Sequence, residues 1–276
     1  MVKENRYSSW LVASDIDGTL NNKRRKLPGR NREAISSFIR KGGIFTLASS
    51  RNPESMSKHY RGLELTIPAV VSTGVGIYDF QKNEYVDFMS LSDKSLETIC
   101  EIKKSYPTLD AVIVAKDMLY VTGAGLWSML YVLADNLTNK WIPDIRKVPK
   151  NEWGKVMFMG PPWRIRNIRR KFEAVPDKEF DIIDTSVFSI EILPEGVNKG
   201  SAVLRLADLL GIDRGHTAGI GDYYNDVDML KSVGVSACCG QAPSKMKRFV
   251  EYVACHCDKG AVADFLGYLI EQKINK

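Results

Sequence analysis

The stretch Ser14-Asp15-Ile16-Asp17-Gly18-Thr19-Leu20 decides how this sequence is interpreted. It follows the apolar run Trp10 to Ala13, which we expect to form a buried strand. Two carboxylates two residues apart therefore stand at the C-terminal end of a strand, where open α/β sheets bind ligands. Because Asp and Gly are also common in solvated turns, the pair needs further polar residues at neighbouring strand ends before it indicates a site.

Outward from this stretch, apolar runs alternate with segments of helical period. A helix is predicted from Pro28 to Arg40, before the apolar run Ile44 to Ala48, and a third run spans Ile67 to Val71. The last third repeats the scheme, with Thr217 to Ile220 as its strand. This alternation is typical of a parallel sheet, so we expect an α/β fold with a Rossmann-like parallel-sheet core.

The middle of the chain has a different texture. Strand-like segments come in adjacent pairs, such as Asp110 to Ala115 followed by Met118 to Thr122, and such pairs indicate antiparallel hairpins. Helical segments interrupt them. We therefore predict an α+β cap domain, residues 82–190, inserted into a core formed by residues 1–81 and 191–276.

Length and composition exclude several classes of protein. The chain has 276 residues, of which 44% are hydrophobic and 26% charged, so it is neither disordered nor fibrous. No apolar run reaches the ~18 residues of a membrane span, and MVKENRYSSW lacks the apolar core of a signal peptide. We expect a cytoplasmic protein without a membrane partner. Five cysteines in a chain of this length do not indicate a disulfide scaffold.

Polar residues also follow the other predicted parallel strands. Ser49-Ser50-Arg51 comes after Ile44 to Ala48, and Gly221-Asp222-Tyr223-Tyr224-Asn225-Asp226 comes after Thr217 to Ile220, while Lys199 opens a helix. Each alone has an ordinary structural explanation, such as a helix cap, a surface lysine or a turn. Their shared position at strand and helix ends favours one common site.

These segments, together with Asn-Lys-Gly at 198–200, resemble in order the four motifs of the haloacid dehalogenase superfamily. The stretch from Ile190 to Ile270 is similar in particular to the Cof-like phosphatases, which carry an inserted type-2 cap between the second and third motifs. The resemblance implies a Mg²⁺-dependent phosphomonoester hydrolase. Its partner would be a small phosphorylated substrate, with sugar phosphates the first expectation.

The resemblance also implies a role for each motif residue. Asp15 would attack phosphorus to give an aspartyl-phosphate, and Asp17 would act as general acid and then as general base. The Mg²⁺ would be held by Asp15, the backbone carbonyl of Asp17, and Asp222. Asp226 would orient the metal ligands and Lys199. The implied substrate-binding residues are Ser49, Ser50, Arg51, Lys199 and Asn225, of which Ser49 and Lys199 are also counted as catalytic.

The chemistry of these motif residues supports phosphoryl transfer independently of the resemblance. A phosphate monoester is doubly negative, so an attacking carboxylate needs nearby cations, and phosphoryl transfer depends mainly on positioning and charge stabilisation. Mg²⁺ prefers the carboxylate oxygens that the motifs supply.

Three positions depart from the pattern of relatives. Ser49-Ser50-Arg51 stands where Thr-Gly-Arg is usual, Thr73-Gly74 replaces Asn-Gly, and Gln241-Ala242 replaces Asn-Ala. The last two lie near the leaving group in relatives, so the departures bear on substrate choice rather than on catalysis.

Two alternatives remain open at this stage. A phosphomutase of the same superfamily would need a second phosphate site, which Arg164, Arg166, Arg169 and Arg170 could supply, although they also fit a solvated helix face. A non-catalytic anion-binding protein would suit the net charge of +6, but Asp15, Asp17 and Asp222 are all present. A nucleic-acid partner is not expected, because the basic run at 23–26 lacks interleaved aromatic residues. The oligomeric state is not predicted.

Overall fold

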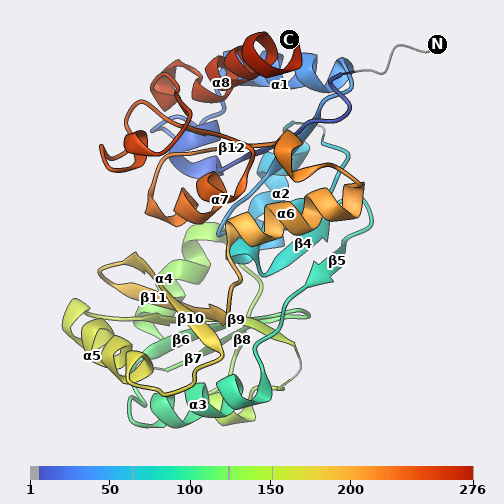
Figure 1. Ribbon diagram of the computed structural model, residues 1–276. Helices are drawn as coiled ribbons and strands as arrows, with labels where there is room; N and C mark the ends of the chain where they lie inside the picture. The colour runs from blue at the N-terminus through green and yellow to red at the C-terminus, as the bar shows by residue number, and fades with distance from the viewer. Residues whose placement is uncertain (1–5, 64, 124, 151, 276) are drawn as a thin grey trace. The chain divides into compact units, whose positions relative to one another are not determined.

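The computed structural model describes residues 6–275 except 64, 124 and 151, and the chain divides into two compact units (Figure 1). The core unit comprises the chain up to Val86 and from Asn198, and the inserted unit spans Asp87–Val197. The sequence placed the joints earlier, after 81 and after 190. The second joint lies later because strand β11 (Ser189–Pro194) is hydrogen-bonded within the sheet of the inserted unit.

The core unit contains a parallel sheet, as predicted. Its five strands run in the order β14-β13-β12-β1-β2, and every neighbouring pair is parallel. This order places the ends of β2 and β12 on either side of β1. The strands are β1 (Leu11–Ser14), β2 (Ile44–Leu47), β12 (Thr217–Gly221), β13 (Val235–Cys238) and β14 (Tyr252–Val253).

A short second sheet continues the core unit beyond β2. It consists of β3 (Ala69–Val71), β4 (Gly76–Asp79) and β5 (Glu84–Phe88), with β3 and β4 antiparallel. An isolated parallel bridge between Ala48 and Val70 joins it to the strand end of β2. Helix α2 (Pro53–Arg61) precedes β3.

Helices cover both faces of the parallel sheet. Val12 of β1 packs in one apolar cluster with Phe38 of α1 (Gly29–Arg40) and Phe265 of α8 (Ala261–Leu269). Leu11, from the opposite face, packs with Leu206 of α6 (Lys199–Leu210), in a second cluster that also includes residues of α7 (Val227–Ser232). Alternating side chains of one buried strand thus face two helical layers, which is the α/β arrangement expected from the sequence.

The inserted unit is an α+β module with its own sheet. The strand order is β10-β11-β9-β6-β7-β8, and all neighbours are antiparallel except β7 and β8. The predicted hairpin is present as β6 (Asp110–Ala115) and β7 (Leu119–Thr122). The remaining strands are β8 (Lys140–Trp141), β9 (Trp153–Met159) and β10 (Phe180–Ser186).

Helices pack on both faces of this second sheet as well. On one face, α3 (Asp93–Lys104) and α5 (Pro162–Glu173) contribute to an apolar cluster with the strands. On the other face, α4 (Leu126–Asp135) packs through Tyr131 and Val132. Each of the two units therefore encloses apolar clusters of its own, so neither depends on the other for a core.

Two further observations bear on the sequence expectations. Among the residues that the structure describes, no helix combines the length and the apolar character needed to traverse a bilayer. All five cysteines are free thiols, and all but Cys255 are buried.

Candidate active site

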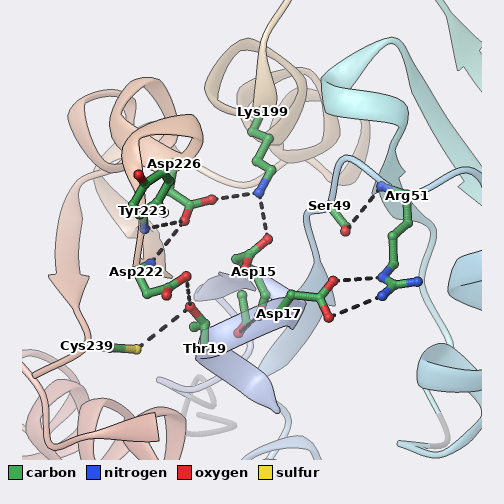
Figure 2. A network of polar contacts seen from close by, with 11 residues as sticks. Asp15, Asp17, Thr19, Ser49, Arg51, Lys199, Asp222, Tyr223, Asp226 and Cys239 are labelled. Atoms are coloured by element: carbon green, nitrogen blue, oxygen red, sulfur yellow. Dashed lines mark hydrogen bonds and ion pairs between the residues drawn. The ribbon is translucent and has the colours of Figure 1, made fainter. Parts of the chain in front are cut away.

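The ends of β1, β2 and β12 bring the predicted motifs together (Figure 2). Asp15 follows β1, and its backbone N–H donates to the carbonyl of Ile220 in β12 at 3.0 Å. Asp222 follows β12, and Ser49 lies just beyond β2. Because parallel strands end at the same edge of a sheet, three segments far apart in the sequence meet in one place.

Lys199 links two of the carboxylates. It is the first residue of α6, whose N-terminus is fixed by Asn198, since the Asn198 side chain accepts from the backbone N–H of Ser201. The Lys199 side chain is completely buried, and its Nζ donates to Asp15 Oδ1 and to Asp226 Oδ1, both at 2.6 Å. This geometry fixes one oxygen of Asp15.

Asp226 and Thr19 hold the loop that carries Asp222. The second oxygen of Asp226 accepts from the backbone N–H groups of Asp222 and Tyr223, at 3.0 and 3.2 Å. Thr19 Oγ1 donates to Asp222 Oδ1 at 3.3 Å and accepts from Cys239 Sγ at 3.7 Å. The position of the Asp222 carboxylate is thus set from two sides.

The carboxylates of Asp15, Asp222 and Asp226 outnumber the lysine that contacts two of them, Lys199. Burial, then the charge of Asp226, raises the pKa of Asp15 to about 8 against the opposing effect of Lys199. Burial and Asp226 likewise raise the pKa of Asp222 to about 6. Burial opposes the charge on Lys199, but Asp15 and Asp226 raise its pKa above the ordinary value, so it stays cationic.

A divalent cation fits these donors. One oxygen each of Asp15, Asp222 and Asp226 lies within 4.8 Å of the others, and the buried Lys199 contacts two of these carboxylates, Asp15 and Asp226. Hard oxygen donors in such a cluster suit Mg²⁺ or a similar ion, which would offset the excess negative charge.

The Asp17 side chain does not join this cluster. Its two oxygens accept from Arg51, from Nε at 2.8 Å and from Nη2 at 3.2 Å (Figure 2). Burial raises the pKa of Asp17, but the hydrogen bonds and charge of Arg51 outweigh burial and lower it below its ordinary value. In this geometry Asp17 is an anion, and it must part from Arg51 before it can carry a proton.

The other predicted residues lie on the same loops. Ser49 is buried, and its Oγ accepts from the backbone N–H of Arg51 at 3.3 Å. Ser50 and Asn225 are half-buried in the loops after β2 and β12. Arg51 Nη1 donates to Ser55 Oγ at 2.6 Å, so the guanidinium serves Asp17 and α2 rather than an open phosphate position. Its predicted role in substrate binding stays a prediction.

Three further contributors to the site are not among the predicted site residues. Thr19 lies inside the first motif, so its proximity to Asp222 could have been anticipated from the shared strand edge. The loop after β3 adopts positive φ at Ser72 and Thr73, 52° and 64°, and their N–H groups donate to Arg51 and Ser49 carbonyls at 2.7 and 3.1 Å. The third is Gln241, whose Nε2 donates to the Gly18 carbonyl at 2.6 Å. From the sequence, Gln241 stands out only as a departure from the pattern of relatives, and no local pattern predicts this contact.

Comparison with known proteins adds to this geometry. A family model described as haloacid dehalogenase-like hydrolase matches residues 12–266. The chain is 23% identical over 263 residues to the HMP-PP phosphatase of Citrobacter koseri, covering 95% of this chain and 96% of that protein.

Solved structures share the fold. A haloacid dehalogenase-like hydrolase from Bacteroides thetaiotaomicron superposes with a TM-score of 0.82 at 19% identity, covering 94% of this chain and 99% of that one. A sugar phosphatase of HAD subclass IIB gives a TM-score of 0.78 at 15% identity, with 94% and 98% covered. With its motifs gathered at one sheet edge and with phosphatases matching nearly its whole length, the chain belongs to the haloacid dehalogenase-like hydrolases and is a phosphatase.

Proposed function

We propose that this phosphatase is a Mg²⁺-dependent phosphomonoester hydrolase that acts through an aspartyl-phosphate on Asp15. The observation that carries the proposal is the buried contact of Lys199 with Asp15 and Asp226, beside Asp222. A bound Mg²⁺, held by Asp15, Asp222 and the backbone carbonyl of Asp17, would offset the charge of the phosphoryl group and of the carboxylates. Its substrate is a small phosphorylated metabolite, and sugar phosphates are the substrate class that we expect first.

The residues divide the reaction into two displacements. Lys199 holds Oδ1 of Asp15, so we assign the attack on phosphorus to Oδ2. As the bond from Oδ2 to phosphorus forms, the bond from phosphorus to the leaving oxygen breaks. Asp17, which must first part from Arg51 and take up a proton from solvent, gives that proton to the leaving oxygen. Asp17 then takes a proton from a water molecule that attacks phosphorus, which releases phosphate and restores Asp15. Ser49 donates to the phosphoryl oxygens throughout.

The purified chain with excess Mg²⁺ is expected to release phosphate from an aryl phosphate, and EDTA is expected to abolish the release. The reason is that the Asp15 carboxylate repels the phosphate dianion of the substrate unless a cation offsets the negative charge of the neighbouring carboxylates. Colorimetric phosphate detection over a panel of monoesters measures it. The panel should include sugar phosphates and HMP-PP, the compound named for the curated relative. Failure to release phosphate from every member would contradict the hydrolase assignment, and an isomeric sugar phosphate as product would indicate a mutase.

We further propose that the inserted unit, Asp87–Val197, is a cap that selects the substrate. The core unit carries every residue assigned to the chemistry and has its own apolar clusters, so it is expected to fold without the insertion. Replacing Asp87–Val197 by a short Gly/Ser linker is expected to leave weak aryl phosphatase activity and remove discrimination among larger substrates. The rates of phosphate release by the truncated and the full chain over the same panel of monoesters measure both effects. A truncated chain that folds and discriminates as the full chain does would place specificity in the core unit.

A cytoplasmic location and the absence of nucleic-acid and membrane partners stay predictions from the sequence.

A further inference from the structure

Gln241 lies three residues beyond the end of β13 and joins three segments of the core unit. Its Nε2 donates to the carbonyl of Gly18 at 2.6 Å, and its Oε1 accepts from the backbone N–H of Cys257 at 3.0 Å. These contacts tie Gly18 to the segment before α8.

The Cys257 contact fixes which way the amide points. A backbone N–H can only donate, so the side-chain oxygen of Gln241 must face Cys257. Its NH₂ group then faces the Gly18 carbonyl, which can only accept. Only a side chain with both a donor and an acceptor satisfies both partners.

Gly18 and Asp222 are packed so closely that a side chain on Gly18 would collide with the Asp222 carboxylate. Gly18 has φ +80°, and a Cβ built on it would lie 2.4 Å from Asp222 Oδ2. The peptide that ends at Gly18 begins at Asp17, whose carbonyl is a proposed ligand of Mg²⁺. Gln241 therefore bonds the loop that packs directly against Asp222, and the separation of these two elements defines the proposed metal position.

We infer that Gln241 is a positioning residue for the metal site: its amide holds the Asp17–Gly18 loop against Asp222, at the separation that Mg²⁺ requires. The inference rests on the proposed function, because it takes Asp222 and the Asp17 carbonyl as ligands. Residues that orient metal ligands in this way typically contribute 10–100-fold to metal affinity or activity.

Gln241→Met tests the role, because Met has a similar length and cannot form these hydrogen bonds. After chelator treatment, titration calorimetry of the full chain with MgCl₂ is expected to show Mg²⁺ binding weakened by about 10–100-fold. The Mg²⁺ concentration that gives half-maximal aryl phosphatase activity is expected to rise by a similar factor. Activity at saturating Mg²⁺ should change less, which separates a positioning role from a catalytic one.

Two companion variants sharpen the result. Gln241→Asn keeps the amide but is one methylene shorter, so it is expected to weaken Mg²⁺ binding as well, and it carries the comparison if Gln241→Met does not fold. Gln81→Met changes the same residue type at an exposed position and should bind Mg²⁺ as the unaltered chain does.

The outcomes separate the two proposals. Folded Gln241 variants that bind Mg²⁺ as tightly as the unaltered chain would overturn the inference, even if their thermal stability falls. An unaltered chain that binds no Mg²⁺ in calorimetry and releases no phosphate would overturn the proposed function, and the inference with it.

Discussion

Asp15→Asn is expected to abolish phosphate release, with a loss on the order of 10⁴-fold or more, because it removes the nucleophile. The fold should hold, since Asn has nearly the same shape and Lys199 keeps its ion pair with Asp226. No phosphoenzyme should form. Intact-mass measurement after mixing with an aryl phosphate and Mg²⁺ tests this directly.

Asp17→Asn is the matched comparison and should fail differently. It keeps the nucleophile but loses the general acid and base, a contribution of typically ~10²–10⁴-fold. With an activated aryl ester, whose leaving group needs little protonation, the variant should still become phosphorylated and accumulate the intermediate. The assigned roles are wrong if the phosphate mass is carried by Asp15→Asn and never by Asp17→Asn.

Lys199→Met is expected to cost both stability and activity. The substitution leaves Asp15 and Asp226 buried without their shared cation, and breaking a buried ion pair in this way typically destabilises a protein by about 3–5 kcal/mol. Activity should fall by at least ~10²-fold, as when one charge-stabilising donor is removed from a site. Urea unfolding in EDTA, together with aryl phosphate hydrolysis in Mg²⁺, measures the two effects.

A double variant separates the two effects. Adding Asp226→Asn to Lys199→Met removes one of the uncompensated carboxylates, so part of the lost stability should return while activity stays at the level of Lys199→Met or below. Lys58→Met, on the exposed face of α2, controls for loss of a lysine and should change the free energy of unfolding by no more than about 0.5 kcal/mol. Equal stability of Lys199→Met and Lys58→Met would mean that the buried lysine is not held as an ion.

Local sequence pattern predicts some of the helices and strands but not all of them. The predicted helices and strands around the motifs are present, because apolar periodicity and capping are local properties. Helix α2 is not among the predicted helices, although Asn52 caps its first turn and Pro53 begins it. Helix α4 is not among them either. Asp110, in β6, accepts from the backbone N–H groups of Trp127 and Ser128 at the start of this helix, a contact that no local pattern contains.

The residue pattern identifies the segments that carry the chemistry, because the carboxylates and Lys199 stand next to strand and helix ends, and a parallel sheet brings such ends together. The contacts between side chains depend on the tertiary fold. It pairs Asp17 with Arg51, gathers Asp226 with Asp15 and Asp222, and places Gln241 on the Gly18 carbonyl, 223 residues away in the chain. A residue pattern locates a backbone position, but a hydrogen bond depends on where the end of each side chain lies within a few tenths of an ångström, and long-range packing sets that.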